Sequence, residues 1–305
     1  MATAGGDLLR LYQFNCLAPS LRICKPLSDI PWAARHSAAC DNIESLRPDI
    51  VALQEFDFVQ PGFAELYAKR LSDFTPYLKR RTGNKSEGVA LFVRNRQFED
   101  VEVQEMDLEP ASCDRVALVA RMRHLASGRR LVVLTSHLTV AHASNGHDIP
   151  HCRPLQMKQL LEQLQGAEPD DVVIIAADMN CDHLEPEPPP NDYGYTVDDV
   201  AQPVHMAFLA GFSSALHSAL GPGCRPISHT CSYAQDGCAD YVFVRGTVRP
   251  LPTHAPRAAQ GCSSVSLRSV CARARARACV CVCVWYCNVG CGDEVGVPGT
   301  RRRPP

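Results

Sequence analysis

The sequence predicts an α/β fold in which two mixed β-sheets pack face to face and helices cover their outer sides. Three observations lead to this prediction. Strand-like segments outnumber helical ones, helices do not separate every pair of strands, and several strand segments are continuously apolar. Continuous apolar runs are typical of strands that are buried on both faces. A simple doubly wound sheet would need more helices, so two packed sheets fit the order of elements better.

Nine segments have strand character, because they are rich in β-branched and aromatic residues and are bounded by polar or turn-forming ones. Residues 171–177, Asp-Val-Val-Ile-Ile-Ala-Ala, are predicted to form a buried central strand. In chain order the strand segments are 8–15, 49–55, 75–81, 88–94, 116–124, 130–138, 171–178, 230–234 and 239–245.

Three segments have helical character. Pro31 opens the first, since proline suits the first turn of a helix, and Arg47-Pro48 ends it. Leucines at helical spacing predict a second helix at 151–165, and residues 204–220 form a third. Between the last two, residues 182–203 are rich in proline and acidic residues and are predicted to be a loop.

The composition is that of a soluble globular protein, with 46% apolar and 21% charged residues. No segment approaches the roughly 18 apolar residues that a membrane helix requires, and the N-terminus lacks the features of a secretory signal. Nine of the 16 cysteines are scattered through 1–255 without zinc-site spacing, which indicates free thiols in a reducing compartment. We therefore expect a cytoplasmic or nuclear protein with no membrane partner.

The charge is unevenly distributed. Residues 256–305 hold 8 Arg and 2 acidic residues, which leaves 23 basic and 31 acidic residues in 1–255. This acidic body lacks the basic stripe of a sequence-independent nucleic-acid binder. It suits an enzyme in which a metal cation meets the phosphate of the substrate. The cluster Lys79-Arg80-Arg81, with Lys85 nearby, is either a small phosphate-binding patch or a solvated strand edge.

Five short polar segments stand where predicted strands end or begin, and together they predict one oxygen-rich site. Each residue alone has an ordinary structural explanation, such as a turn, an Asx-turn or a cap. In chain order the segments are Gln13-Phe14-Asn15, Leu53-Gln54-Glu55, Ser136-His137-Leu138, Ala177-Asp178-Met179-Asn180 and Ala239-Asp240-Tyr241.

The chemistry of these residues suggests phosphoryl hydrolysis. Glu55 is a suitable ligand for Mg²⁺, or for Mn²⁺, because such cations prefer hard oxygen donors, and Asn15 would lie beside the metal or an attacking water. Asp178 would orient or deprotonate that water, and Asn180 would hold the water or a phosphate oxygen. His137 would donate a hydrogen bond to a non-bridging phosphate oxygen.

Further motifs join this set. They are Gln13-Phe14-Asn15-Cys16-Leu17-Ala18, Arg47-Pro48-Asp49-Ile50 ahead of Glu55, Gly88-Val89-Ala90-Leu91-Phe92, and the segment from Arg153 to Gln156. Over about residues 7–255 the chain resembles the endonuclease/exonuclease/phosphatase superfamily. Within it, the chain is similar to the deadenylase branch that includes nocturnin and the catalytic subunits of the carbon-catabolite-repression deadenylase complex.

The resemblance implies a four-layer α/β sandwich, with Glu55 and Asn15 at the metal and Asp178, Asn180 and His137 around the phosphate. It also implies substrate contacts at three further positions and a role for an acid near the end of the domain. Asp240 would orient the histidine of a terminal Ser-Asp-His motif. The substrate-contact positions are Lys79, Asp114, where the branch tends to have Asn, and Arg153.

The chain departs from the family pattern at its C-terminal end. No Asp-His pair follows Asp240, and His254 comes too soon and lacks a preceding Asp. In 271–284, Arg-Ala repeats give way to Cys-Val repeats, as expected if dinucleotide-repeat DNA were translated; a genuine low-complexity tail is the alternative. We therefore expect a domain at 7–255 that lacks its last strand and leaves a sheet edge unpaired. Residues 256–305 would then be a disordered or non-native tail.

The leading functional prediction is an Mg²⁺-dependent phosphodiester hydrolase that acts as a 3′-exoribonuclease on poly(A). Its activity would be lost or impaired, because the terminal histidine is absent. One alternative is a nucleotide 2′-phosphatase acting on NADP(H), a phosphorylated dinucleotide. Another is a non-catalytic remnant or mispredicted gene product. An abasic-site endonuclease or a lipid or inositol phosphatase would share the core residues but fits the opening motif less well.

Overall fold

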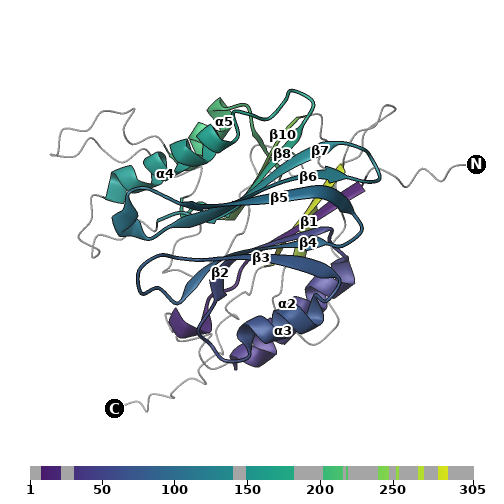
Figure 1. The fold of residues 1–305 in the computed structure, drawn as a ribbon, viewed down its shortest axis with the longest axis vertical. Coiled ribbons are helices and arrows are strands. Elements are labelled where there is room, and N and C mark those ends of the chain that lie inside the picture. Colours follow the sequence, from purple (N-terminus) through teal and green to yellow (C-terminus); the bar gives the residue numbers. More distant parts are fainter. Residues whose placement is uncertain are drawn as a thin grey trace, which may run out of the picture.

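The computed structural model describes residues 8–21, 31–139, 149–181, 202–215, 218, 240–246, 252–253, 267–270 and 281–287. Within this part of the chain the strands form two sheets. Helices α2 and α3 lie outside one sheet, and helices α4 and α5 lie outside the other (Figure 1). The four layers are therefore helix, sheet, sheet and helix, as predicted.

The first sheet has the order β11-β12-β13-β1-β2-β4-β3. Strands β1 and β2 run parallel, so their carboxyl ends meet at the same edge, with Asn15 opposite Gln54. The bounds are β1 Leu8–Asn15, β2 Ile50–Asp57, β3 Phe74–Arg80, β4 Glu87–Arg94, β11 Pro252–Thr253, β12 Leu267–Val270 and β13 Cys281–Cys287.

The second sheet has the order β5-β6-β7-β8-β10-β9. Strands β7 and β8 are parallel, with His137 opposite Asp178, while β10 runs antiparallel to β8. The bounds are β5 Phe98–Asp107, β6 Val116–His124, β7 Arg130–His137, β8 Val172–Asp178, β9 Ser213–Ser214 and β10 Asp240–Arg245.

The helices follow the predicted pattern in part. Helix α2, Trp32–Leu46, starts directly after Pro31, and Arg47 ends it in a left-handed conformation. Helix α4, Ile149–Gln163, matches the predicted second helix. The remaining helices are α3 Phe63–Arg70 and α5 Pro203–Leu209, with short 3-10 turns at Pro19–Leu21 and Ala111–Cys113. None of the helices in the described residues is long and apolar enough to cross a membrane.

Three apolar cores hold the layers together, and they explain why the strands are continuously apolar. Successive side chains of a strand point to opposite faces. In β1, Leu9 and Leu11 pack between the two sheets, whereas Tyr12 and Phe14 pack against the α2 and α3 layer. A third cluster, which includes Ile175, joins the second sheet to α4 and α5. Both faces of the central strands are thus buried.

Several predicted elements differ from the structure. Strand β5 was not predicted, because its sequence FEDVEVQEMD is mostly polar; it is a half-exposed edge strand. Helix α3 was also missed, and α5 ends at Leu209, well short of the predicted 220. The predicted strand at 230–234, most of the loop at 182–203 and His254 lie outside the described residues.

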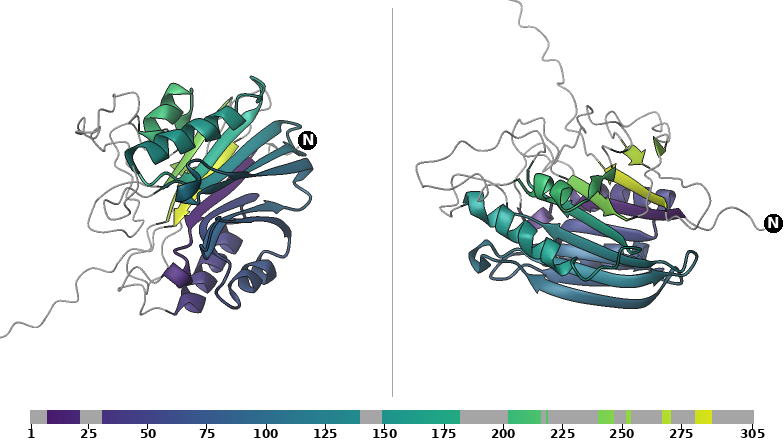
Figure 2. Two further views of the ribbon diagram at one scale, coloured as in Figure 1. Left: turned by 60° about the vertical axis from the view of Figure 1, so that its left-hand side comes forward. Right: turned by 90° about the horizontal axis from the view of Figure 1, so that it is seen from above.

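The largest difference concerns the C-terminal segment. Strand β13 lies parallel to β1, with Leu8 opposite Cys281 and Gln13 opposite Tyr286, and Figure 2 shows the yellow β13 beside the purple β1. This edge of β1 is therefore paired in the structure, whereas the sequence led us to expect that a sheet edge would be left unpaired. The strict alternation of residues in the tail favours an extended backbone. Without β13, this edge of β1 would expose unpaired backbone N–H and C=O groups, with which an extended segment can pair. Whether the family's own last strand is missing stays a prediction.

Candidate active site

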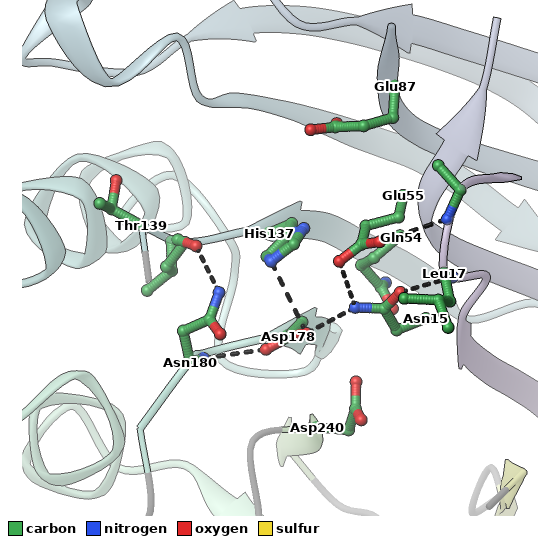
Figure 3. Close-up of polar contacts among 12 residues, drawn as sticks. Asn15, Leu17, Gln54, Glu55, Glu87, His137, Thr139, Asp178, Asn180 and Asp240 are labelled. Carbon is green, nitrogen blue, oxygen red and sulfur yellow. Dashed lines mark hydrogen bonds and ion pairs between the residues drawn. The ribbon is translucent and has the colours of Figure 1, made fainter. Parts of the chain in front are cut away.

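The structure brings four of the predicted site residues together where the two sheets meet. Asn15 ends β1 and Glu55 lies in β2 of the first sheet, whereas His137 and Asp178 end β7 and β8 of the second. Their side chains point toward one another in Figure 3. Both pairs of strands are parallel, so the carboxyl ends of each pair deliver their polar residues to one place.

Asn15 bridges the two acids. Its Nδ2 donates to Glu55 Oε1 at 3.1 Å and to Asp178 Oδ2 at 2.8 Å. Its Oδ1 accepts a hydrogen bond from the Leu17 backbone N–H at 2.9 Å, which fixes the direction of the amide. In this orientation Asn15 turns a donor, not its oxygen, toward the carboxylates. The carboxylates of Glu55 and Asp178 therefore lie only two hydrogen bonds apart.

A β-bulge places Glu55. The register between β2 and β4 shifts between Gln54 and Phe56, and Glu55 adopts a left-handed φ of 51°. In a regular strand, Gln54 and Glu55 would point to opposite faces. Here both take part in the polar cluster, because Gln54 Nε2 donates to Thr135 Oγ1 of the second sheet at 3.0 Å. The bulge thus turns two adjacent side chains toward the same region.

The acids lack a strong cationic partner. Burial raises the pKa of Glu55 to about 7, the hydrogen bond from Asn15 opposes this rise, and the charges of Glu87 and Asp178 add to it. Burial also raises the pKa of Asp178, although hydrogen bonds from Asn15 and the Asn180 N–H work in the opposite direction. Among the described residues, no Lys or Arg nitrogen lies within 4.0 Å of either carboxylate.

This donor set fits a hard divalent cation. Two carboxylates that repel each other, the buried Asp178 and the partly buried Glu55, favour a positive charge that can enter the site. Mg²⁺ is commonly held by one or two carboxylates while it keeps several waters. The described residues contain no cluster of three or more His, Cys, Asp and Glu side chains that could hold a metal, so an all-protein cage is absent there. Glu55 is the residue best placed to hold such an ion.

His137 is a neutral neighbour of Asp178. Its Nε2 lies 3.7 Å from Asp178 Oδ2, and its Nδ1 is buried without a hydrogen-bond partner in the described structure. Burial lowers the pKa of His137 well below its usual value, and the charges of Arg115 and Arg81 lower it further. The imidazole therefore carries no charge near neutral pH.

Asn180 and Arg153 shape the turn after β8. Asp178 Oδ1 accepts the Asn180 N–H at 2.9 Å, which is the Asx-turn that the isolated sequence also suggested. Asn180 has a left-handed φ of 48°, and its Nδ2 donates to the Leu138 backbone oxygen at 2.8 Å. The buried Arg153 donates through Nη1 to the Asn180 backbone oxygen. In this structure Arg153 supports the turn.

Asp240 also belongs to the edge of the cluster. It lies opposite Asp178 in the register of β10 and β8. Its Oδ1 accepts a hydrogen bond from Gln13 Nε2 at 3.1 Å, and Gln13 also donates to Gln54 Oε1 at 3.3 Å. Two buried glutamines thus link Asp240 to the bulge that carries Glu55.

Two predicted substrate contacts lie apart from the four-residue cluster. Lys79 Nζ forms ion pairs with Asp107 at 2.9 Å and Glu105 at 3.3 Å, both on β5. Asp114 accepts a hydrogen bond from Thr82 Oγ1 at 3.0 Å and lies 3.8 Å from Lys85 Nζ. In the described structure neither forms a hydrogen bond or ion pair with Glu55 or Asp178. Their roles at the substrate stay predictions.

Two charged residues near the site were missed. Glu87 begins β4, is 1% exposed, and pairs through Oε1 with Arg81, while its Oε2 has no partner in the described structure. Arg115 precedes β6 and is 6% exposed. Their only sequence signal was that each stands at the start of a predicted strand, as Asp240 does at the start of β10.

Comparisons with known proteins bear on the family of this chain. The profile of the Endonuclease/Exonuclease/phosphatase family matches residues 12–261. The chain belongs to the endonuclease/exonuclease/phosphatase family. This family takes its name from enzymes that hydrolyse phosphate esters, so the chain is a hydrolase-family domain.

Individual members of the endonuclease/exonuclease/phosphatase family give the same result. Nocturnin from Drosophila melanogaster is 25% identical over 201 residues, which is 61% of this chain but only 30% of that protein. The human Nocturnin catalytic domain with bound sulfate anion superposes with a TM-score of 0.57 at 17% identity, covering 90% of this chain and 89% of the other. ANGEL2, described as a 2′,3′-cyclic phosphatase and solved with adenosine-2′,3′-vanadate, gives 0.57 at 16% identity, covering 76% and 82%. The two structures confirm the fold.

Proposed function

We propose that this domain hydrolyses phosphodiester bonds with a divalent cation, Mg²⁺ or Mn²⁺, and that its substrate is the 3′ end of RNA, in particular poly(A). The observation that carries the proposal is the bridge by Asn15 between the carboxylate of the partly buried Glu55 and that of the buried Asp178. Structural acids are normally paired with cations, so two acids held this close favour a metal-dependent reaction. The sequence motifs shared with the deadenylase branch favour the RNA substrate.

Each side chain has a task that its contacts permit. Glu55 would hold the cation, with the Asn15 amide beside it, and the cation would polarise a phosphoryl oxygen and lower the pKa of bound water. Asp178 is fixed through both oxygens by Asn15 and the Asn180 N–H, and its raised pKa makes it a better proton acceptor than an ordinary Asp. It would orient the attacking water and take its proton.

His137 and Asn180 would act on the phosphate side. Because His137 is neutral, it would serve as a hydrogen-bond donor to a phosphate oxygen rather than as a cation. Asn180 uses its Nδ2 on Leu138, which leaves its Oδ1 to hold a water. In family members that have the terminal Ser-Asp-His motif, the residue at the position of Asp240 would orient its histidine. Since no Asp-His pair follows Asp240, we expect turnover about 10²–10⁴-fold below that of a family member with the terminal histidine.

The proposal is tested with the purified chain and an end-labelled RNA that carries a 3′ run of adenosines, with and without Mg²⁺. We expect slow shortening from the 3′ end that requires the cation and is lost in Glu55→Gln. Glu44→Gln is the matched control, because Glu44 is an exposed residue of α2 that pairs with Arg70. Shortening in excess chelator, or full activity of Glu55→Gln, would contradict the mechanism.

Parallel reactions separate the alternatives. Release of phosphate from NADP(H) without shortening of RNA would replace the exonuclease by a 2′-phosphatase. Opening of adenosine 2′,3′-cyclic phosphate without shortening of RNA would favour a 2′,3′-cyclic phosphatase, as ANGEL2 is described. Stabilisation by Mg²⁺ without turnover of any of these substrates would identify a non-catalytic remnant.

A further inference from the structure

Arg115 is a buried cation whose hydrogen-bonding capacity is unused. It stands directly before β6, where its backbone oxygen accepts the Leu108 N–H at 2.8 Å. Only 6% of the residue is exposed, and both Nε and Nη1 are buried without a hydrogen-bond partner in the described structure. A buried guanidinium is normally paired with a carboxylate or with carbonyl groups, because burial without partners is costly.

The neighbouring Arg81, in contrast, has a hydrogen-bond partner for each of its side-chain nitrogens. Its Nε donates to the Asp114 backbone oxygen at 3.0 Å and its Nη2 to the Cys113 backbone oxygen at 3.1 Å. Its Nη1 pairs with Glu87. Each nitrogen of Arg81 therefore has a hydrogen-bond partner, and Arg81 already pairs with Oε1 of Glu87.

The charge of Arg115 acts on the candidate active site. It lowers the pKa values of His137 and Asp178, while Glu87, Glu55 and Asp178 raise its own. Burial, followed by the charge of Arg81, lowers the pKa of Arg115 to about 10, so the group remains charged at neutral pH. Among the described residues, no carboxylate oxygen lies within 4.0 Å of an Arg115 nitrogen, which is the limit for an ion pair. The register of β6 with β7, in which Ala117 lies opposite Ser136, places Arg115 close to the end of β7 that carries His137.

We propose that Arg115 is the anion-binding residue of this site and donates to the non-bridging oxygens of a phosphate group. Arginine suits phosphate because its planar guanidinium presents several donors and never loses its charge there. A cation held by Glu55 would offset the repulsion that the acids exert on a phosphate, and the unused N–H groups of Arg115 would donate to the phosphate oxygens. The substrate must then carry at least one ionised phosphate. This inference rests on the proposed function, because it concerns the same site.

The competing explanation is that Arg115 only offsets the charge of the three acids. Substitution by methionine separates the two, since it keeps the length of the side chain and removes the charge. If Arg115 binds substrate phosphate, Arg115→Met should fold with unchanged or higher stability, because an unpaired buried charge is removed. If Arg115 serves the fold, both Arg115→Met and Arg115→Gln should unfold the protein.

The experiment measures binding of inorganic sulfate by isothermal titration calorimetry, in excess Mg²⁺ and at constant ionic strength. We expect the wild type to bind and Arg115→Met to bind at least about tenfold more weakly, with Arg115→Lys in between. Arg123→Met is the matched control on the same strand, because Arg123 is exposed and paired with Glu99 and Asp100. It should bind sulfate like the wild type.

Two results would overturn the inference. One is wild-type affinity for sulfate in Arg115→Met. If Arg115→Met does not fold, Arg115→Gln takes its place, and failure of both to fold would give Arg115 a structural role. The proposed function is tested separately by hydrolysis. If sulfate binding depends on Arg115 but the chain shows no turnover, the anion site is supported and the hydrolase function is rejected. If wild type and Arg115→Met turn over substrate equally, the hydrolase function is supported and the anion site is rejected.

Discussion

Replacement of Asn15 by alanine tests the bridge at the centre of the site. The substitution removes one donor that serves two carboxylates, at 3.1 Å from the partly buried Glu55 and 2.8 Å from the buried Asp178. A hydrogen bond to a charged group contributes about 1.5–3 kcal/mol, and the two losses will not add fully, because Glu55 can take up a proton when its donor is lost. We expect the free energy of unfolding to fall by about 2–4 kcal/mol.

Urea unfolding followed by circular dichroism measures this loss, in chelator and in excess Mg²⁺. The cation should recover part of the stability of Asn15→Ala, because it replaces the missing positive partner between the acids. Asn95→Ala is the control: its side-chain oxygen accepts one exposed hydrogen bond from Thr75, so it should change stability by less than about 0.5 kcal/mol. If Asn15→Ala were no more destabilising than Asn95→Ala, the bridge would not stabilise the site.

Two further predictions follow from charge and from packing. Because the pKa of Glu55 is raised from 4.5 to about 7, its contribution to stability is fully present below pH 4.5 and is lost as the pH rises through about 7. In metal-free urea titrations the wild type should therefore lose stability relative to Glu55→Gln over that interval, and Mg²⁺ should restore only the wild type; parallel pH curves would refute this. Gly88→Ala should weaken the pairing of β3 with β4, because an added Cβ would lie 2.1 Å from the Lys79 backbone oxygen. Its melting temperature should fall by several degrees, and an unchanged value would contradict the close approach.

The position of the site could be predicted from the sequence because it depends on where strands end. Apolar runs that stop at Asn15, at His137 and at Asp178 locate the carboxyl ends of strands, and parallel pairing then brings those ends together. Glu55 was placed at a strand end for the same reason. The bulge that actually directs its side chain depends on pairing with β4, which local sequence does not reveal.

Other features depend on contacts between distant segments. Lys79 was expected at the substrate, but its partners Glu105 and Asp107 lie on β5, a strand whose polar sequence gave no sign of pairing. Arg115 looks like an ordinary charged residue in the sequence. Its unused nitrogens become evident only when every neighbour within reach is known. Such properties belong to the three-dimensional surroundings and have no local signature.

The candidate site is divided between the two sheets, and this division determines how the domain would lose activity. Asn15 and Glu55 belong to one sheet, and His137 and Asp178 belong to the other. Their relative position is set by the central apolar core and by hydrogen bonds across it, such as that from Gln54 to Thr135. A slip of about 1 Å between reacting groups can reduce a rate about 10²-fold. A small displacement of one sheet relative to the other would therefore greatly reduce the rate of hydrolysis without unfolding the chain. A cavity-forming substitution in the core between the sheets, such as Ile174→Ala, would therefore lower the rate of hydrolysis although it changes no polar residue of the cluster.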